Sequence, residues 1–218
     1  MEKQRLIHHL YPGIALFIIT VINFIYYVIS NKEITLLTSL YLFSMALIPF
    51  IFPFIYKFFK YDVTLFVNIL FTIQIYLAVH LGTIFKLYTI ISFYDALLHT
   101  WFGVIGSFLV LSIILNDEWK GLKKGTIAII IMLSVVGLGG FWEILEYIID
   151  CLTGGDSQMV GEMISQGKSP ISDTMEDLIV TFIGVLIFYL FCLADRFNKY
   201  ALLNKLYKNI ISKNKTKK

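Results

Sequence analysis

Six long apolar stretches constrain the fold of this chain more than any other feature of its sequence. Each stretch is long enough to cross a hydrocarbon core of about 30 Å as an α-helix. We therefore predict an all-α fold, a polytopic membrane bundle of about six transmembrane helices. The predicted spans are Leu10–Ile29, Ile34–Tyr56, Val63–Phe85, Phe93–Leu115, Thr126–Ile149 and Ser172–Ala194.

The composition agrees with a membrane protein and excludes other classes. Hydrophobic residues make up 58% of the chain and charged residues only 15%, whereas an average soluble domain has about 45–50% and about 25%. This excludes a disordered chain and an ordinary soluble enzyme. Pro49 and Pro53 lie inside the second span, so we expect that helix to kink or break there.

The distribution of Lys and Arg predicts the orientation, because cytoplasmic loops of membrane proteins carry an excess of these residues. With both termini cytoplasmic, only Lys32, Lys86 and Lys168 fall outside, and the other fifteen of the eighteen fall inside. We expect one transmembrane domain over residues 1–195, in which 91–194 carry the polar site, and a basic cytoplasmic tail over 196–218. This tail favours contact with anionic membrane lipids, and no nucleic-acid partner is expected because no base-reading motif accompanies it.

Ionisable residues gather where the last three spans reach the outer boundary of the membrane. Each span presents a polar stripe at helical spacing, so that its members share one face. The residues are Asp95 and His99 in the fourth span, Glu143, Glu146 and Asp150 in the fifth, and Asp173 and Asp177 in the sixth, where Glu176 is left out of the stripe. Charged groups at such depth are costly unless they face the bundle interior and find partners, so this cluster is a candidate functional site.

Several carboxylates close together cannot all stay ionised without protons, basic groups or a bound cation. We expect a divalent metal ion, held by His99, Glu143, Glu146, Asp173 and Asp177, with Glu143 or Glu146 as general base where it is not a ligand. Carboxylate oxygens and imidazole suit zinc, manganese, iron or magnesium, without distinguishing among them. Asp95 and His80 are predicted to orient these ligands through hydrogen bonds without contacting the metal ion themselves.

Simpler interpretations exist for some of these residues. Asp95 follows Ser92 by three residues, and Asp173 follows Pro170, so either acid is also compatible with a role in capping a helix start. His80, on an otherwise apolar face, is more typical of a hydrogen-bonded structural histidine than of a metal ligand. Capping does not explain His99, Glu143, Glu146 or Asp177, because each is predicted to lie a turn or more inside its span.

The segments YDALLHTWFG, FWEILEYIID and SDTMEDLIVTFIG resemble the YjdF-like group of bacterial integral membrane proteins. That resemblance covers about residues 91–190 and implies functional importance for Asp95, His99, Glu143, Glu146, Asp173 and Asp177. A shorter similarity to VanZ-like proteins rests on the Asp-x-x-x-His motif alone. The resemblance implies a bacterial plasma membrane, and it brings no biochemical activity with it.

Three functions from different classes fit the sequence. The first is a metal-dependent hydrolase or transferase acting on a lipid or a lipid-linked envelope precursor, because the site opens at the outer interface. The second is a proton- or cation-coupled transporter, although the cytoplasmic halves of the spans offer mainly Asn68, Thr72, Gln74 and Ser112 as polar groups. The third is a structural or partner-binding membrane subunit.

Overall fold

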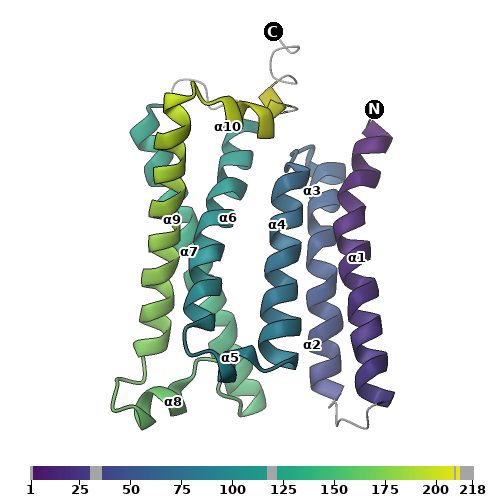
Figure 1. The fold of residues 1–218 in the computed structure, drawn as a ribbon, viewed down its shortest axis with the longest axis vertical. Coiled ribbons are helices and arrows are strands. Elements are labelled where there is room, and N and C mark those ends of the chain that lie inside the picture. The colour runs from purple at the N-terminus through teal and green to yellow at the C-terminus, as the bar shows by residue number, and fades with distance from the viewer. Residues whose placement is uncertain (1, 30–35, 117–121, 209, 212–218) are drawn as a thin grey trace.

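The protein is an all-helical bundle with six helices or broken helices of membrane-spanning length among the described residues (Figure 1). The computed structural model describes residues 2–29, 36–116, 122–208 and 210–211. Predictions for Lys32, Lys120 and the last residues of the tail therefore lie outside the described residues. The helical segments are α1 (Glu2–Ile29), α2 (Leu36–Leu47), η1 (Ile48–Phe50), α3 (Ile51–Phe59), α4 (Leu65–Ile75), η2 (Tyr76–Ile84), α5 (Leu87–Ile90), α6 (Tyr94–Asn116), α7 (Lys124–Thr153), α8 (Val160–Ser165), α9 (Ser172–Phe197) and α10 (Ala201–Leu206).

The second span is interrupted where its prolines predict. The short 3₁₀ segment η1 separates α2 from α3, and Pro49 stands in its first turn. Proline lacks the N–H that an α-helix needs and its ring crowds the preceding turn. The expected break is thus confirmed, and the remaining part of the span, α3, continues to Phe59.

The third span changes its winding instead of ending. The α-helical part, α4, passes into the π-helical segment η2, which ends with a hydrogen bond from Phe85 N to His80 O. Such wide turns often occur at functional sites. Here the segment carries His80, which is fully buried against α1.

The last three spans pack closely together, and α6 and α9 run in the same direction (Figure 1). Gly103 of α6 and Gly184 of α9 face each other at their crossing. A Cβ atom added to Gly103 would lie 2.2 Å from Thr181 O, and one added to Gly184 would lie 2.1 Å from Thr100 O. Only glycine permits this approach, which is how small residues bring membrane helices together.

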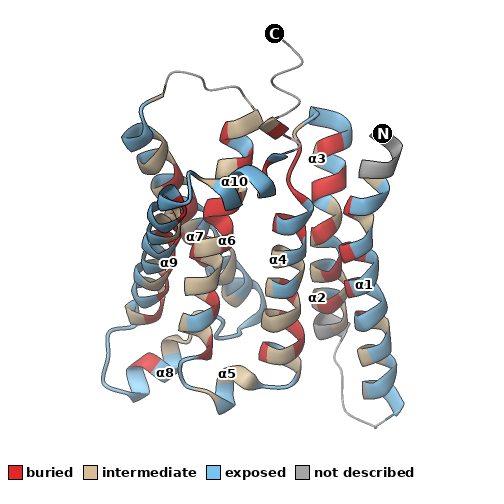
Figure 2. Cartoon of the chain, turned by 45° about the horizontal axis from the view of Figure 1, so that its top comes forward, coloured by how far each residue is buried: buried red, intermediate tan, exposed pale blue. Residues whose placement is uncertain are grey.

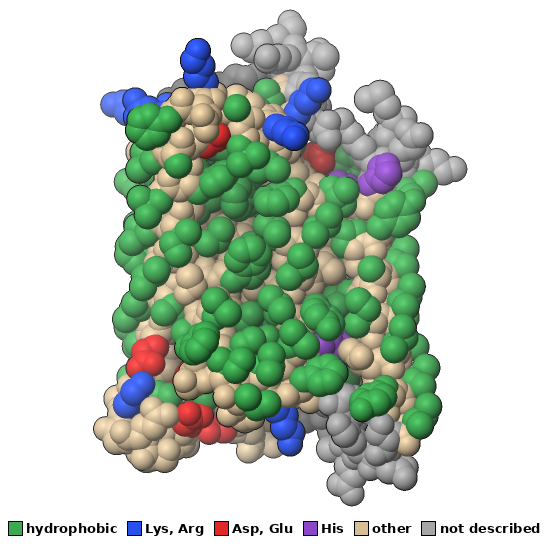
Figure 3. Space-filling model, viewed as in Figure 1, with side chains coloured by type: hydrophobic (Ala, Val, Ile, Leu, Met, Phe, Trp, Pro, Cys, Tyr) green, Lys and Arg blue, Asp and Glu red, His purple; other side chains and the backbone are tan. Residues whose placement is uncertain are grey.

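Apolar side chains cover the outside of the bundle, as expected for contact with lipid. Exposed residues lie along the outer faces of the helices, whereas buried residues lie between the helices (Figure 2). On the face shown in Figure 3 the charged groups are confined to the two ends. One end carries the start of α1 together with α10 and is here called the terminal end. The other carries the start of α6 and the end of α7, and is called the site end.

Part of the predicted tail packs against the bundle. Asp195 accepts hydrogen bonds from Leu202 N at 3.1 Å and Leu203 N at 2.9 Å, which fixes the turn into α10. Beyond α10 the Tyr207 hydroxyl donates to Phe108 O at 2.7 Å, and Ile210 is fully buried. The tail thus adds to the hydrophobic core at the terminal end, a role that its Lys-rich composition does not predict.

Candidate functional site

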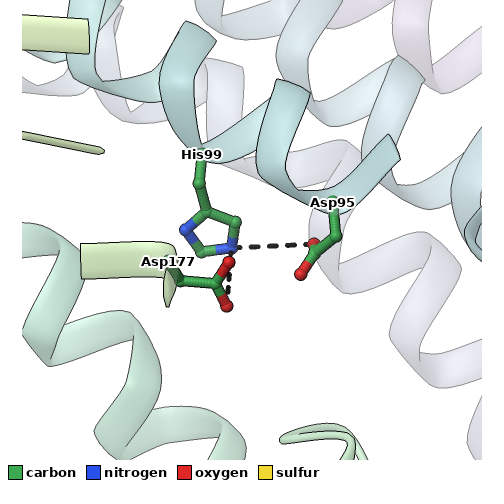
Figure 4. Close-up of side chains that lie close together, drawn as sticks. All are labelled: Asp95, His99 and Asp177. Atoms are coloured by element: carbon green, nitrogen blue, oxygen red, sulfur yellow. Dashed lines mark ion pairs between the residues drawn. The ribbon is translucent and has the colours of Figure 1, made fainter. Parts of the chain in front are cut away.

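Three side chains from two helices form a compact group at the site end. His99 Nε2 lies 3.7 Å from Asp95 Oδ1 and 3.7 Å from Asp177 Oδ2. One potential ligand atom from each of the three residues lies within 4.8 Å of the other two. Figure 4 shows one nitrogen of the His99 ring joined by dashed lines to both carboxylates, with Asp95 on the same helix and Asp177 on the neighbouring one.

The local sequence explains this arrangement. Asp95 and His99 are four residues apart on α6, so their side chains lie on one helix face. Asp177 is brought alongside by the crossing of Gly103 and Gly184, and Thr181 Oγ1 adds a 3.4 Å hydrogen bond to His99 O. The predicted convergence of His99 with Asp177 is therefore present in the structure.

The group is largely removed from solvent and surrounded by negative charge. The side chain of His99 is 12% exposed and that of Asp177 is 5% exposed. Asp177 also lies close enough to four other carboxylates to interact with their charges: Asp95, Asp173, Glu143 and Glu146. Like charges in a medium of low polarity repel strongly, so a group of this kind must hold a proton or a cation.

The two glutamates of α7 lie beside the compact group and have different surroundings. Glu143 is 4% exposed, and its carboxylate lies beside the side chains of Thr174 and Gln158. Glu146 accepts a 2.7 Å hydrogen bond from Trp142 Nε1 on the same helix. The structure brings both residues near Asp177 but does not place them among the three closest ligand atoms.

The surroundings of Asp173 and Asp95 differ from those expected from the sequence. The N-cap of α9 is Ile171, which offers no side-chain hydrogen bond, so the interpretation of Asp173 as the cap is wrong. Asp173 is instead a buried acid in the first turn, near the group. Asp95 was predicted to contact a ligand and not the metal ion, yet it is as close to His99 Nε2 as Asp177 is.

The structure does not bring His80 to this group. Asn23 Nδ2 lies 2.9 Å from His80 Nδ1, and Thr20 Oγ1 lies 3.0 Å from His80 Nε2. Because Thr20 Oγ1 donates in turn to Leu16 O, a neutral imidazole satisfies the whole chain by accepting at Nδ1 and donating at Nε2. His80 therefore ties η2 to α1, in agreement with the structural interpretation of this residue.

Two features of the site were not predicted from the sequence. Burial raises the pKa of the Tyr88 phenol, and the nearby charge of Asp95 raises it further, so this group from α5 stays protonated and able to donate. The loop after α7 is held by Asp150, which accepts hydrogen bonds from Ser157 N at 2.7 Å and Gln158 N at 3.0 Å. A tyrosine between two spans and an acid at a helix end give little sign of such roles in a sequence.

The loop continues toward α9 and lies next to the glutamates. Gln158 Nε2 donates to Thr174 Oγ1 at 3.2 Å, and it also lies 3.5 Å from the backbone oxygen of Glu143. Gly154 and Gly167 have φ angles of +67° and +72°, a region that residues with side chains rarely adopt. This segment, with α8 in it, joins α7 to α9 at the edge of the site.

The geometry of the compact group suits a metal ion. Ligand atoms about 2.1 Å from a tetrahedral zinc ion are separated by about 3.4 Å. The two 3.7 Å distances from His99 Nε2 are close to that separation, and all three potential ligand atoms lie within 4.8 Å of one another.

Comparison with known proteins places the chain in a family. The family described as predicted membrane protein (DUF2238) matches residues 12–196. The chain therefore belongs to this family, to which the YjdF-like proteins also belong, and the resemblance noted in the sequence is confirmed. Neither the search of curated proteins nor the search of solved structures found a match.

Proposed function

We propose that this member of the DUF2238 family binds a divalent metal ion between Asp95, His99 and Asp177. The observation that carries the proposal is the meeting of one imidazole nitrogen and two carboxylate oxygens from two helices within 4.8 Å. A cation would offset the repulsion among the surrounding carboxylates, and zinc, manganese, iron and magnesium all accept such ligands. This ligand set differs from the one expected from the sequence. Asp95 is now a proposed ligand, whereas Glu143, Glu146 and Asp173 lie near the proposed ion without binding it.

The chemistry we propose is metal-assisted hydrolysis or group transfer. A bound divalent ion lowers the pKa of a coordinated water and polarises the bond under attack. Glu143 is the favoured general base, because its carboxylate is buried and lies near Asp95 and Asp177 without being one of the three closest ligands. One oxygen of Glu146 is already engaged by Trp142, which favours a positioning role for that residue.

The proposed substrate is an amphiphilic molecule, a lipid or a lipid-linked envelope precursor. The site lies at the end of membrane-spanning helices, where the polar part of such a molecule meets the protein while its apolar part stays in the bilayer. The segment from Gly154 to Ile171 would act as a lid, because it borders the site and contains two glycines with positive φ.

The assignment of ligands is tested by comparing two acids of α9. Asp177→Asn removes a proposed ligand, whereas Glu176 is an exposed residue whose carboxylate pairs with Lys168 at 2.8 Å. We expect Asp177→Asn to weaken binding of zinc or manganese by more than about 100-fold. This is a larger loss than is usual for a residue that hydrogen-bonds to a ligand without contacting the metal ion. Glu176→Gln should bind as the wild type does in isothermal titration calorimetry, and equal affinities for the two variants would exclude Asp177 as a ligand.

We further propose that the terminal end is cytoplasmic and that the site faces the opposite side of a bacterial plasma membrane. Among the described residues, the terminal end carries the basic groups of the loop before α7 and of the tail, and the site end carries Lys86 and Lys168. Single-cysteine variants at Lys168 and Lys123, in a background without Cys151 and Cys192, test this. An impermeant maleimide should label intact cells at position 168 and not at 123, and the reverse pattern would overturn the orientation.

A further inference from the structure

Two apolar grooves adjoin on the surface of α6, away from the candidate metal site. The first has a volume of about 450 Å³ and is lined by residues of η1, α3, α4, α6 and the loop before α4. The second has a volume of about 410 Å³ and is lined by residues of α6 and α7. Ile113 lines both, so the two grooves meet at this residue. Volumes of this size are typical of small-molecule sites, which span about 300–1,000 Å³.

The lining of both grooves is mainly apolar and is open to the bilayer. Ile51 and Phe59 in the first groove, and Leu133 and Leu138 in the second, are exposed side chains on helices of membrane-spanning length. Gly137 also lines the second groove, and nothing lies within 4 Å of a Cβ atom placed there. Each groove is therefore a space that an acyl chain of a lipid can fill.

The first groove has the depth of one lipid leaflet. Its lining begins at Ile48, in the break of the second span, and continues to Phe59, where α3 ends at the terminal end (Figure 1). These two residues are about 17 Å apart along the helix axis, whereas half of a hydrocarbon core measures about 15 Å. The groove thus matches the length of one acyl chain in the leaflet at the terminal end.

A basic residue stands where each groove reaches the terminal end. Lys60 lies between Phe59 and Tyr61, which both line the first groove. Lys123 is the exposed N-cap of α7 and precedes Ile130 of the second groove by seven residues, so it lies on the same side of the helix as the groove. Positive charge therefore adjoins the ends of both grooves.

The acidic residues at this end do not cancel that charge at the surface. Asp62 is 4% exposed and its Oδ1 lies 3.7 Å from His9 Nε2, and Asp195 is 5% exposed and accepts backbone hydrogen bonds at the start of α10. Among the side chains that the structure describes here, the exposed charged ones are all basic. Such a surface complements a phosphate headgroup.

We propose that the two grooves hold one anionic glycerophospholipid of the leaflet at the terminal end. One acyl chain fills each groove, Ile113 lies between the chains, and the phosphate lies near Lys60 and Lys123. Basic sites between membrane-spanning helices bind anionic headgroups in this way. This lipid site is independent of the proposed metal site at the other end of the bundle, so its failure and that of the metal site are measured separately.

The lipid site is tested by native mass spectrometry of the full-length protein, released from detergent and titrated with dioleoyl phosphatidylglycerol or dioleoyl phosphatidylcholine. The two lipids have the same acyl chains and differ in the charge of the headgroup. We expect the wild type to bind one phosphatidylglycerol about tenfold or more tightly than phosphatidylcholine. Equal affinities for the two lipids would overturn the proposal.

The headgroup contact is tested with the double variant Lys60→Asn/Lys123→Gln. Asparagine suits position 60, where φ is +60°. We expect binding of phosphatidylglycerol to weaken by about tenfold or more and binding of phosphatidylcholine to stay unchanged. Lys199→Asn/Lys205→Gln is the matched control, because it removes the same charge at the same end, lines neither groove and also begins at a residue with positive φ. An equal loss in both double variants would assign the attraction to the whole basic surface and overturn the site.

The grooves themselves are tested with Gly137→Phe, which should place a ring in the second groove. Gly125→Phe on the same helix is the matched control, since nothing lies within 4 Å of a Cβ atom there either and Gly125 lines neither groove. We expect about tenfold weaker binding of phosphatidylglycerol for Gly137→Phe alone, with both variants unfolding at the temperature of the wild type. Unchanged affinity in Gly137→Phe would contradict an acyl chain in this groove.

Discussion

Replacing Gly184 by alanine is expected to destabilise the protein by about 3 kcal/mol, the upper end of the usual cost of overpacking. The new Cβ atom would lie 2.1 Å from Thr100 O and 2.9 Å from the Cα atom of Gly103, whereas ordinary contacts begin near 3.4 Å. Because the obstacle is backbone, α6 and α9 must move apart. Gly103→Ala should have the same effect, since its Cβ atom would meet Thr181 O at 2.2 Å.

The matched control for this prediction is Gly137→Ala on α7. Nothing lies within 4 Å of a Cβ atom at that position, and alanine favours a helix more than glycine does. Thermal unfolding in detergent should show a clear loss for Gly184→Ala and no loss for Gly137→Ala. Equal melting temperatures for the two variants would mean that the glycine crossing does not determine how α6 and α9 pack.

Replacing His99 by alanine is expected to remove nearly all divalent metal from the purified protein. His99 Nε2 lies between the carboxylates of Asp95 and Asp177, so its loss takes away the only nitrogen donor of the compact group. We expect the affinity for zinc to fall by more than about 100-fold, a larger loss than is usual for a residue that contacts a ligand but not the metal ion. Removing the ring leaves the crossing of Gly103 and Gly184 unchanged, so the variant should still insert and fold.

A useful control is His80→Ala, because this histidine is buried even more deeply than His99 but pairs with Thr20 and Asn23. It should lose stability, since the buried Thr20 and the half-buried Asn23 lose their partner, while its folded fraction keeps its metal. If His80→Ala and His99→Ala lost metal to the same extent, the loss would reflect damage to the fold and not removal of a ligand.

The spans and the break at Pro49 were predictable because hydropathy and the missing proline N–H act locally in the sequence. The stripe of Asp95 and His99 was predictable for the same reason, since both lie on one helix. The sequence did not allow us to predict which carboxylates approach His99 most closely. That choice depends on the parallel packing of α6 and α9, which the contact between Gly103 and Gly184 sets and which no local pattern specifies.

The pairings between distant parts of the chain were also beyond the sequence. His80 meets Thr20 and Asn23, which lie about sixty residues earlier, and Tyr207 donates to Phe108 from the tail. Each pairing joins ordinary polar groups whose partners are fixed only when the helices pack. An isolated histidine or tyrosine in an apolar helix gives no sign of which neighbour it will find.

The most direct test of the account is the metal content of the wild-type protein, purified without chelator and measured by elemental mass spectrometry. We expect about one divalent ion per chain, as in a site with three protein ligands and an open position. An absence of stoichiometric metal, together with no uptake on titration with zinc, manganese, iron(II) or magnesium, would contradict the proposed metal site.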